Sequence, residues 1–250
     1  MIPQVVLFDV DNTLTRSKAP LERSVAMPLT ALIRKTKVAF IGGGKLEQFK
    51  KQVVAFLPTD TEFKNLYLLP TSGAALYEYA LDEWVPVFEE KLSEDEALKI
   101  RDALMESAES TGLVDFSAPS YGERIEFRGS QVTLSVLGQE APVDLKEAWD
   151  PDQAKREALR AAVAALLPEY DVKRGGSSSI DVTKHGVNKA SGVQRLSEYL
   201  AVPIAEMLYI GDQLFPGGND EVVKETGIKT RAVANPEETT TVINELLADT

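Results

Sequence analysis

The chain has 250 residues, of which 44% are hydrophobic, so it can bury a sizeable core, either as one large domain or as a core carrying a smaller insert. Its formal net charge of −12 at pH 7 opposes non-specific attraction to nucleic-acid backbones and anionic lipids, so we expect neither nucleic acid nor membrane as a partner. The absence of Cys excludes disulfides and thiolate metal sites, and one histidine, His185, excludes a multi-histidine site. Any bound metal must therefore use oxygen ligands.

The N-terminal part of the chain alternates short apolar strands with amphipathic helices. The predicted strands span 4–8, 37–41 and 66–69, and the predicted helices span 21–33 and 45–57. The first apolar run is too short for a signal peptide or a membrane span, and no basic segment precedes it. We therefore expect a cytoplasmic protein.

The middle of the chain has a different pattern. Residues 123–128 and 131–137 alternate in polarity on either side of Gly129-Ser130, which indicates an antiparallel hairpin. Helices are predicted on both sides of it, over 93–109 and 152–167, and a further strand over 177–182.

The C-terminal part returns to alternating strands and helices. Strands are predicted at 207–210 and 229–233, and helices at 189–200, after Asn219 and at 236–247. This order predicts a doubly wound, Rossmann-like α/β core with a parallel sheet, made of residues 1–83 and 186–250. An α+β insert, residues 84–185, interrupts it.

Two carboxylates follow the first strand directly, at Asp9 and Asp11. Open α/β sheets place their ligands at the carboxyl ends of the strands. Asp9 is a candidate nucleophile and hard-cation ligand, and Asp11 is a candidate general acid and base. An acidic turn or a helix N-cap is the alternative, and this short motif alone favours that alternative.

A second apolar strand also ends in a carboxylate, Asp212, and the loop Pro216-Gly217-Gly218-Asn219-Asp220 supplies another. Because Mg²⁺ prefers oxygen ligands, we predict a magnesium site from Asp9, Asp212 and the backbone carbonyl of Asp11. Asp220 is a less favoured direct ligand and more simply orders its loop. Coincidental surface loops are the remaining alternative.

Lys189 stands at the predicted start of a helix, between the insert and the Asp212 strand. It can bridge Asp9 and phosphoryl oxygens as a fixed cation, or it can be a solvated surface lysine. His185 is better interpreted as a hinge or surface residue than as a base.

These residues resemble the haloacid-dehalogenase (HAD) superfamily of phosphotransferases, whose Asp-X-Asp-X-Thr signature matches Asp9 to Thr13. Along nearly the whole chain, further motifs are similar to the eukaryotic-type phosphomannomutases and the related sugar phosphatases, whose cap domain is also inserted into the core. These motifs are Phe8-Asp9-Val10-Asp11, Gly42-Gly43, Ile125-Glu126-Phe127-Arg128, Ser179-Ile180-Asp181-Val182 and Pro216-Gly217-Gly218-Asn219-Asp220.

The resemblance implies a role for each matching residue. It makes Asp9 the nucleophile, Asp11 the general acid and base, and Lys189 the lysine that stabilises the phosphoryl group. It makes Asp212 a ligand of a Mg²⁺ cofactor, and the full set of candidate metal ligands is Asp9, Asp11, Asp212 and Asp220. The candidate substrate-binding residues are Thr13, Gly43, Gly44, Arg128, Ser179 and Asp181.

The chain departs from the family pattern in two places that matter for chemistry, and in one that is tolerable. Gly44 stands where the family has a Ser or Thr that hydrogen-bonds the phosphoryl group, so we expect weakened chemistry that relies on backbone N–H groups. In the insert, Gln139 and Lys146 stand where arginines are expected, which removes fork-shaped donors for a second phosphate. Asn12 replaces a more usual Gly, and Asn tolerates left-handed backbone.

We therefore predict a Mg²⁺-dependent enzyme that forms an aspartyl-phosphate on Asp9 and acts on a small phosphorylated sugar or polyol. Attack by water on this intermediate makes it a phosphatase, which the thinned arginine set favours. Attack by a sugar hydroxyl makes it a phosphomannomutase, the main alternative. A catalytically weak phosphosugar-binding protein is a more remote one, and a homodimer formed through the insert is left open.

Overall fold

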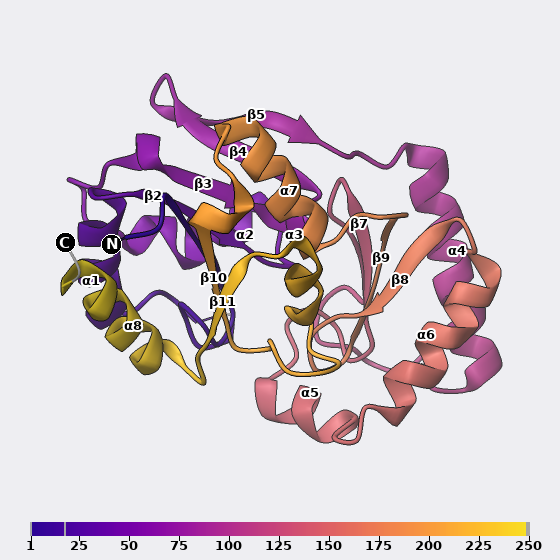
Figure 1. Ribbon diagram of the computed structural model, residues 1–250. Helices are drawn as coiled ribbons and strands as arrows, with labels where there is room; N and C mark the ends of the chain where they lie inside the picture. Colours follow the sequence, from indigo (N-terminus) through magenta and orange to yellow (C-terminus); the bar gives the residue numbers. More distant parts are fainter. Residues whose placement is uncertain (1, 18, 249–250) are drawn as a thin grey trace. The chain divides into compact units, whose positions relative to one another are not determined.

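The computed structural model describes residues 2–17 and 19–248, and its contacts divide the chain into two compact units (Figure 1). Unit 1 consists of Met1–Glu89 and Asn188–Thr250, and unit 2 of Glu90–Val187. Unit 2 begins after strand β5, Glu83–Glu89, because that strand pairs within the sheet of unit 1. The sequence-based insert boundary at residue 84 falls inside this strand.

Unit 1 is built on a seven-stranded sheet in the order β11-β10-β1-β2-β3-β4-β5. The bounds of the other strands are β1 Val5–Asp9, β2 Lys37–Ile41, β3 Leu66–Leu69, β4 Ala75–Ala80, β10 Met207–Gly211 and β11 Lys229–Ala232. The first five strands in this order pair in parallel, and β4 and β5 extend the sheet antiparallel. The chain winds outward from β1 in one direction through β2 and in the other through β10, so the β1–β10 border is the topological switch point.

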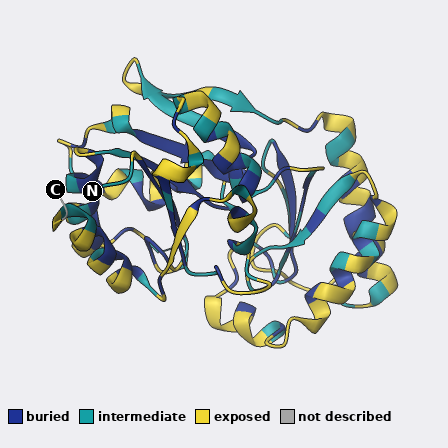
Figure 2. Ribbon diagram, viewed as in Figure 1, coloured by how far each residue is buried: buried dark blue, intermediate teal, exposed yellow. Residues whose placement is uncertain are grey.

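Helices cover both faces of this sheet. They are α1 Arg23–Ile33, α2 Leu46–Gln52, α3 Pro70–Gly73, α7 Lys189–Leu200 and α8 Pro236–Ala248, with 3₁₀ turns η1 Val54–Phe56, η2 Phe63–Asn65, η3 Ile204–Glu206 and η4 Glu221–Thr226. One apolar cluster joins the strands to α1, α2 and α8, and a second joins them to α7 and η4. Strands β1 and β3 are buried at every residue, and β2 and β10 at all but one, as the dark blue strands at the centre of the sheet in Figure 2 show. The predicted doubly wound α/β core is confirmed.

Two predicted helices are shorter than expected. The helix expected over 45–57 ends at Gln52, because the β-branched pair Val53-Val54 follows and Leu57 is extended ahead of Pro58. The helix expected after Asn219 is only the 3₁₀ turn η4, which ends at Gly227 with a φ of 77°.

Unit 2 is an α+β unit, as predicted. Its antiparallel sheet has the order β6-β7-β9-β8, with β6 Ile125–Phe127, β7 Gln131–Ser135, β8 Tyr170–Arg174 and β9 Ser179–Lys184. Its helices are α4 Glu94–Thr111, α5 Val143–Trp149 and α6 Ala154–Leu166. The apolar face of the sheet packs on α4 and α6, and the opposite face carries polar side chains. Among residues 2–17 and 19–248, no helix is long and apolar enough to cross a membrane.

Candidate active site

Asp9 ends the buried central strand β1 at the switch point of the unit 1 sheet. Asp9 is 5% exposed, and the residues around it in the sheet are apolar. Burial raises the pKa of Asp9 well above its usual value, Lys189 opposes this rise, and the nearby carboxylate of Asp220 adds to it. A counter-charge is therefore needed to keep this carboxylate ionised, as a nucleophile must be.

Lys189 supplies a buried positive charge to Asp9. Asn188 caps the N-terminus of α7 through a reciprocal pair of hydrogen bonds with Ser191, which fixes Lys189 as the first helical residue. The Lys189 Nζ donates hydrogen bonds to Asp9 Oδ1 at 2.5 Å, Asp220 Oδ1 at 2.6 Å and Asn219 Oδ1 at 3.2 Å. Burial would lower the pKa of Lys189, but the Asp220 and Asp9 carboxylates raise it well above its usual value. The ammonium group stays charged at neutral pH.

Asp220 is fully buried and held on both carboxylate oxygens. The Tyr209 hydroxyl donates to Asp220 Oδ1 at 2.5 Å, and the backbone N–H of Gln213 donates to Asp220 Oδ2 at 3.0 Å. Gly211 makes this approach feasible, since a Cβ there would lie 2.5 Å from Asp220 Oδ2. This position agrees with the loop-ordering interpretation of Asp220.

Asp212 follows β10 and lies within hydrogen-bonding distance of Thr13. The Thr13 hydroxyl is 3.4 Å from Asp212 Oδ1, and Thr13 itself is fully buried. The Thr239 hydroxyl donates to the Thr13 carbonyl at 2.7 Å, which ties the Asp9–Thr13 loop to α8. Burial and the neighbouring Asp220 raise the pKa of Asp212.

The three carboxylates of Asp9, Asp212 and Asp220 each offer an oxygen within 4.8 Å of the others. Three carboxylates and one Lys189 ammonium leave two negative charges in a mostly buried site. One divalent cation would balance them, and an all-oxygen donor set suits Mg²⁺. The residues present therefore fit this cofactor.

Asp11 lies in the loop after β1, and its carboxylate is not part of that cluster. The Gln52 Nε2 donates to Asp11 Oδ1 at 3.0 Å and to the Thr15 hydroxyl at 2.7 Å. Asn12 beside it has a φ of 61°, as its replacement of Gly led us to expect. Neither Gln52 nor Tyr209 was identified from the sequence, because each was counted only as part of its helix or strand.

The Gly42–Gly44 loop after β2 is hydrogen-bonded to α3, the short segment after β3, which contains a left-handed turn. Thr71 and Ser72 have φ values of 50° and 57°, and their N–H groups donate at 2.8 Å to the carbonyls of Gly44 and Gly42. Such backbone is unfavourable for a β-branched residue, so tertiary contacts must hold it. The turn thereby fixes the candidate phosphoryl-binding loop.

The candidate substrate-binding residues of unit 2 lie on or beside the polar face of its sheet. Glu126, Thr133 and Asp181 are cross-strand neighbours, and the Thr133 hydroxyl donates to Asp181 Oδ1 at 2.7 Å. The Arg128 guanidinium bonds Glu126 Oε2 at 2.8 Å and Gln139 Oε1 at 3.3 Å. Burial raises the pKa of Asp181, and Arg128 opposes this rise.

Gln139 and Lys146, which replace expected arginines, are hydrogen-bonded to each other, and Gln139 also accepts from Arg128 beside this face. Lys146 is 8% exposed and donates to the Gln139 carbonyl at 2.8 Å.

Ser179 lies on the same polar face of the sheet, two residues before Asp181 on β9 and opposite Ser135. The His185 side chain is 81% exposed, and its Nδ1 lies 2.8 Å from Asp171 Oδ1, so its interpretation as a surface residue is confirmed.

Comparison with solved structures identifies the fold. An IMP-nucleotidase of Plasmodium falciparum superposes with a TM-score of 0.68 at 19% identity, over 98% of this chain and 68% of that one. The C-terminal domain of trehalose-6-phosphate phosphatase from Candida albicans superposes with a TM-score of 0.64 at 19% identity, over 98% of this chain and 93% of that one. Both likenesses show that the chain shares the fold of these phosphatases.

Sequence comparison identifies the family to which the chain belongs. A family model described as eukaryotic phosphomannomutase matches residues 25–249, and the chain belongs to that family. Phosphomannomutases of Encephalitozoon cuniculi and Saccharomyces cerevisiae are each 24% identical to it, over 97% of this chain and 93% of theirs. The predicted resemblance is confirmed.

Proposed function

We propose that this protein is a Mg²⁺-dependent phosphatase that hydrolyses a small sugar or polyol phosphate through an aspartyl-phosphate on Asp9. The observation that carries the phosphoryl-transfer part is the buried contact of Lys189 with both Asp9 and Asp220, at 2.5 and 2.6 Å. A lysine with 4% side-chain exposure between two carboxylates is poorly explained as a surface residue.

The residues of unit 1 account for both halves of the reaction. An Asp9 carboxylate oxygen attacks phosphorus, the bond from phosphorus to the sugar oxygen breaks, and Asp11 protonates that oxygen as it leaves. Asp11 then takes a proton from water, the water oxygen attacks phosphorus, the bond from phosphorus to the Asp9 oxygen breaks, and inorganic phosphate leaves. Lys189 stabilises negative charge on the phosphoryl oxygens in both steps.

Asp9, Asp212 and the Asp11 carbonyl would hold Mg²⁺. Asp220 orients Lys189 by accepting a hydrogen bond from its Nζ. When bound, this ion supplies positive charge to the phosphoryl oxygens. Thr13 positions Asp212, and the N–H groups of Gly43 and Gly44 are the proposed donors to the phosphoryl group.

The polar face of unit 2 favours water over a sugar hydroxyl as the final acceptor. A mutase must grip a second phosphate, and the proposed substrate contacts Arg128, Ser179 and Asp181 include one guanidinium that already bonds Glu126 and Gln139. Thr133, Ser135 and Ser179 offer hydroxyl groups, and Glu126 and Asp181 repel a second anion. This mixture suits the hydroxyl groups of a sugar or polyol better than a phosphate.

Phosphomannomutase activity is the second candidate, because the family match covers 225 of the 250 residues, from 25 to 249. Relatives carrying that name align with 97% of this chain. A homodimer through unit 2 stays a prediction.

A screen of phosphorylated sugars and polyols tests the proposal, with released phosphate as the readout. We expect turnover that chelator abolishes and MgCl₂ restores, and a Mg²⁺ requirement raised at least tenfold in Asp212→Asn, because carboxylate charge supplies most of the binding. Full turnover in excess chelator would refute the metal assignment. An inactive wild type across the screen would refute the phosphatase.

A further inference from the structure

Two glutamines of α2 connect the Gly42–Gly44 loop to Asp11. The Gln48 Nε2 donates to Gln52 Oε1 at 3.1 Å, and the Gln52 Nε2 donates to Asp11 Oδ1 at 3.0 Å and Thr15 Oγ1 at 2.7 Å. The two residues are four apart and therefore lie on one side of the helix. The Gln52 amide thus donates two hydrogen bonds and accepts one.

The direction of this chain of amides is fixed by charge. An ionised carboxylate only accepts hydrogen bonds, so with Asp11 in that form the Gln52 nitrogen faces Asp11 and the Gln52 oxygen faces Gln48. Gln52 is 5% exposed, so its side chain has little freedom to leave this arrangement. The amide therefore holds Oδ1 of Asp11 in one place.

The other end of the chain lies on Gly44. A Cβ at residue 44 would be 2.6 Å from Gln48 Oε1 and 2.7 Å from Gln48 Cδ, so the Gln48 amide occupies the space that a side chain at position 44 would need. Gly44 itself is fixed through its carbonyl, which accepts from the Thr71 N–H at 2.8 Å. Gln48 thus packs against a fixed loop and supports Gln52 from that side.

We propose that Gln52 is a positioning residue that holds Asp11 for proton transfer, and that Gln48 supports Gln52 from the Gly44 side. This inference rests on the proposed function, in which Asp11 donates and accepts the proton. It adds that the geometry of Asp11 depends on α2, a helix that contributes no reacting group of its own.

The test compares Gln52→Met, which keeps the size of the side chain but removes its donors, with Lys51→Ala, an exposed neighbour on the same helix. Steady-state kinetics on the sugar phosphate found in the screen should show kcat lowered about 100-fold in Gln52→Met, with KM changed less than about twofold. Gln48→Ala should lower kcat about tenfold, and Lys51→Ala should change neither constant.

A double-mutant cycle separates positioning from a general loss of structure. In the Asp11→Asn background, Gln52→Met should have no further effect on kcat, because both changes remove the same step. Additive losses, or a raised KM with unchanged kcat, would overturn the proposal.

A crystal structure of Gln52→Met gives a readout that does not depend on turnover. We expect the Asp11 carboxylate to be displaced or disordered while Asp9 and Lys189 keep their contact. An Asp11 carboxylate in its original place would overturn the inference. By contrast, an inactive wild type combined with a displaced Asp11 would refute only the proposed reaction.

Discussion

The contact between Lys189 and Asp9 joins residues 180 positions apart in the chain. Their positions follow from simple rules: Asp9 ends a buried parallel strand, and Lys189 is the first residue of a capped helix on one face of the same sheet. A buried ion pair of this kind costs desolvation energy and adds little stability by itself. Its retention in a mostly apolar core is better explained by chemistry.

Asp9→Asn tests the nucleophile. We expect turnover below about one thousandth of wild type, because a neutral amide is a poor nucleophile. The fold should remain, since burial already disfavours the charged form of Asp9 and the Lys189 ammonium keeps Asp220 as a partner. Phosphate release and thermal melting measure the two effects. Turnover comparable to wild type in a folded variant would contradict the mechanism.

Gly44→Ser tests whether the missing hydroxyl can simply be restored. We expect a loss of about threefold to tenfold in kcat instead of a gain, because the new Cβ would displace the Gln48 amide. In the Gln48→Ala background this clash is absent, so Gly44→Ser should lower kcat no further there. A single Gly44→Ser variant more active than wild type would show that Gln48 gives way at no cost.

At the scale of elements, the position of α7 depends on two glycines. A Cβ on Gly192 would lie 2.9 Å from the Cα of Gly73, and a Cβ on Gly73 would lie 2.8 Å from the Cα of Gly192. The backbone of α7 therefore touches the left-handed turn after β3 directly. This contact sets the depth at which Lys189 enters the site.

Gly192→Ala should lower the free energy of unfolding by about 1–3 kcal/mol, because the added methyl group meets backbone that cannot move aside. It should also lower kcat, since α7 carries Lys189. Gly176→Ala is the matched control: a Cβ there meets nothing within 4 Å, and its φ is not in the left-handed region. Equal effects of the two substitutions would argue against close packing as the cause.

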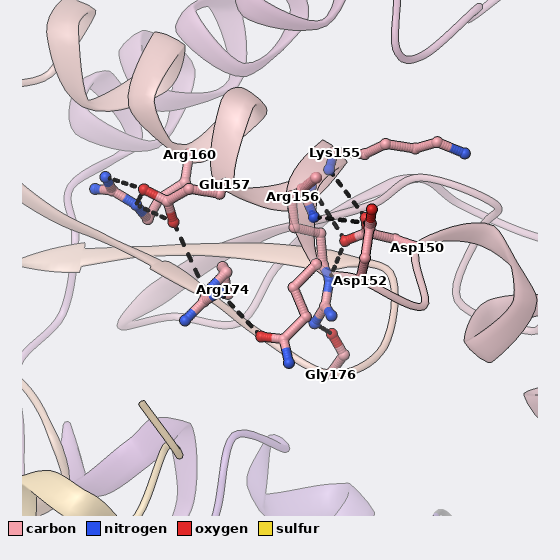
Figure 3. Close-up of polar contacts among 10 residues, drawn as sticks. Asp150, Asp152, Lys155, Arg156, Glu157, Arg160, Arg174 and Gly176 are labelled. Atoms are coloured by element: carbon pink, nitrogen blue, oxygen red, sulfur yellow. Dashed lines mark hydrogen bonds and ion pairs between the residues drawn. The ribbon is translucent and has the colours of Figure 1, made fainter. Parts of the chain in front are cut away.

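In unit 2, a buried ion pair fixes the loop that leads into β9 (Figure 3). Asp150 accepts from Arg156 Nε at 2.8 Å and from the N–H groups of Lys155 and Arg156, and Arg156 NH1 donates to the Gly176 carbonyl at 2.6 Å. Burial would raise the pKa of Asp150, but these hydrogen bonds lower it below its usual value of 3.8.

Asp150→Ala should therefore destabilise unit 2 by about 3 kcal/mol at pH 7, because it leaves the Arg156 charge buried without its partner. A carboxyl group with a lowered folded pKa stabilises the fold above pH 3.8, and this contribution is lost as the pH falls through the folded value. The difference between wild type and variant in urea unfolding should shrink at pH 3. Glu147→Ala, at an exposed position of α5, is the control, and a difference independent of pH would contradict the account.

Much of unit 1 could be predicted because its strands are short buried apolar runs, and parallel strands end at one edge of a sheet. That rule alone predicts that Asp9 and Asp212 meet. The β4–β5 hairpin was missed because its turn uses Leu81 and Asp82 with φ values of 54° and 62°, without the glycine that such turns favour. The Tyr209 hydroxyl and the Gln52 amide were missed because their contacts depend on side-chain directions that spacing does not determine.

At the scale of the whole molecule, the proposed reaction assigns the reacting groups to unit 1, and the two candidate reactions make different demands on the polar face of unit 2. A mutase returns the phosphoryl group to the sugar and needs a site for two phosphates. A phosphatase releases it to water and needs a site for one phosphate and several hydroxyl groups. The ion pair of Arg128 with Glu126 favours the phosphatase, because it occupies the guanidinium that a second phosphate would need.

The most direct test supplies mannose 1-phosphate, Mg²⁺ and a trace of sugar bisphosphate, and follows free phosphate and the 6-phosphate isomer in the same reaction. Asp9→Asn serves as the blank for both products. We predict phosphate release that depends on Asp9, with little isomer formed. Efficient isomer formation with little free phosphate would contradict the phosphatase and identify the alternative, a phosphomannomutase.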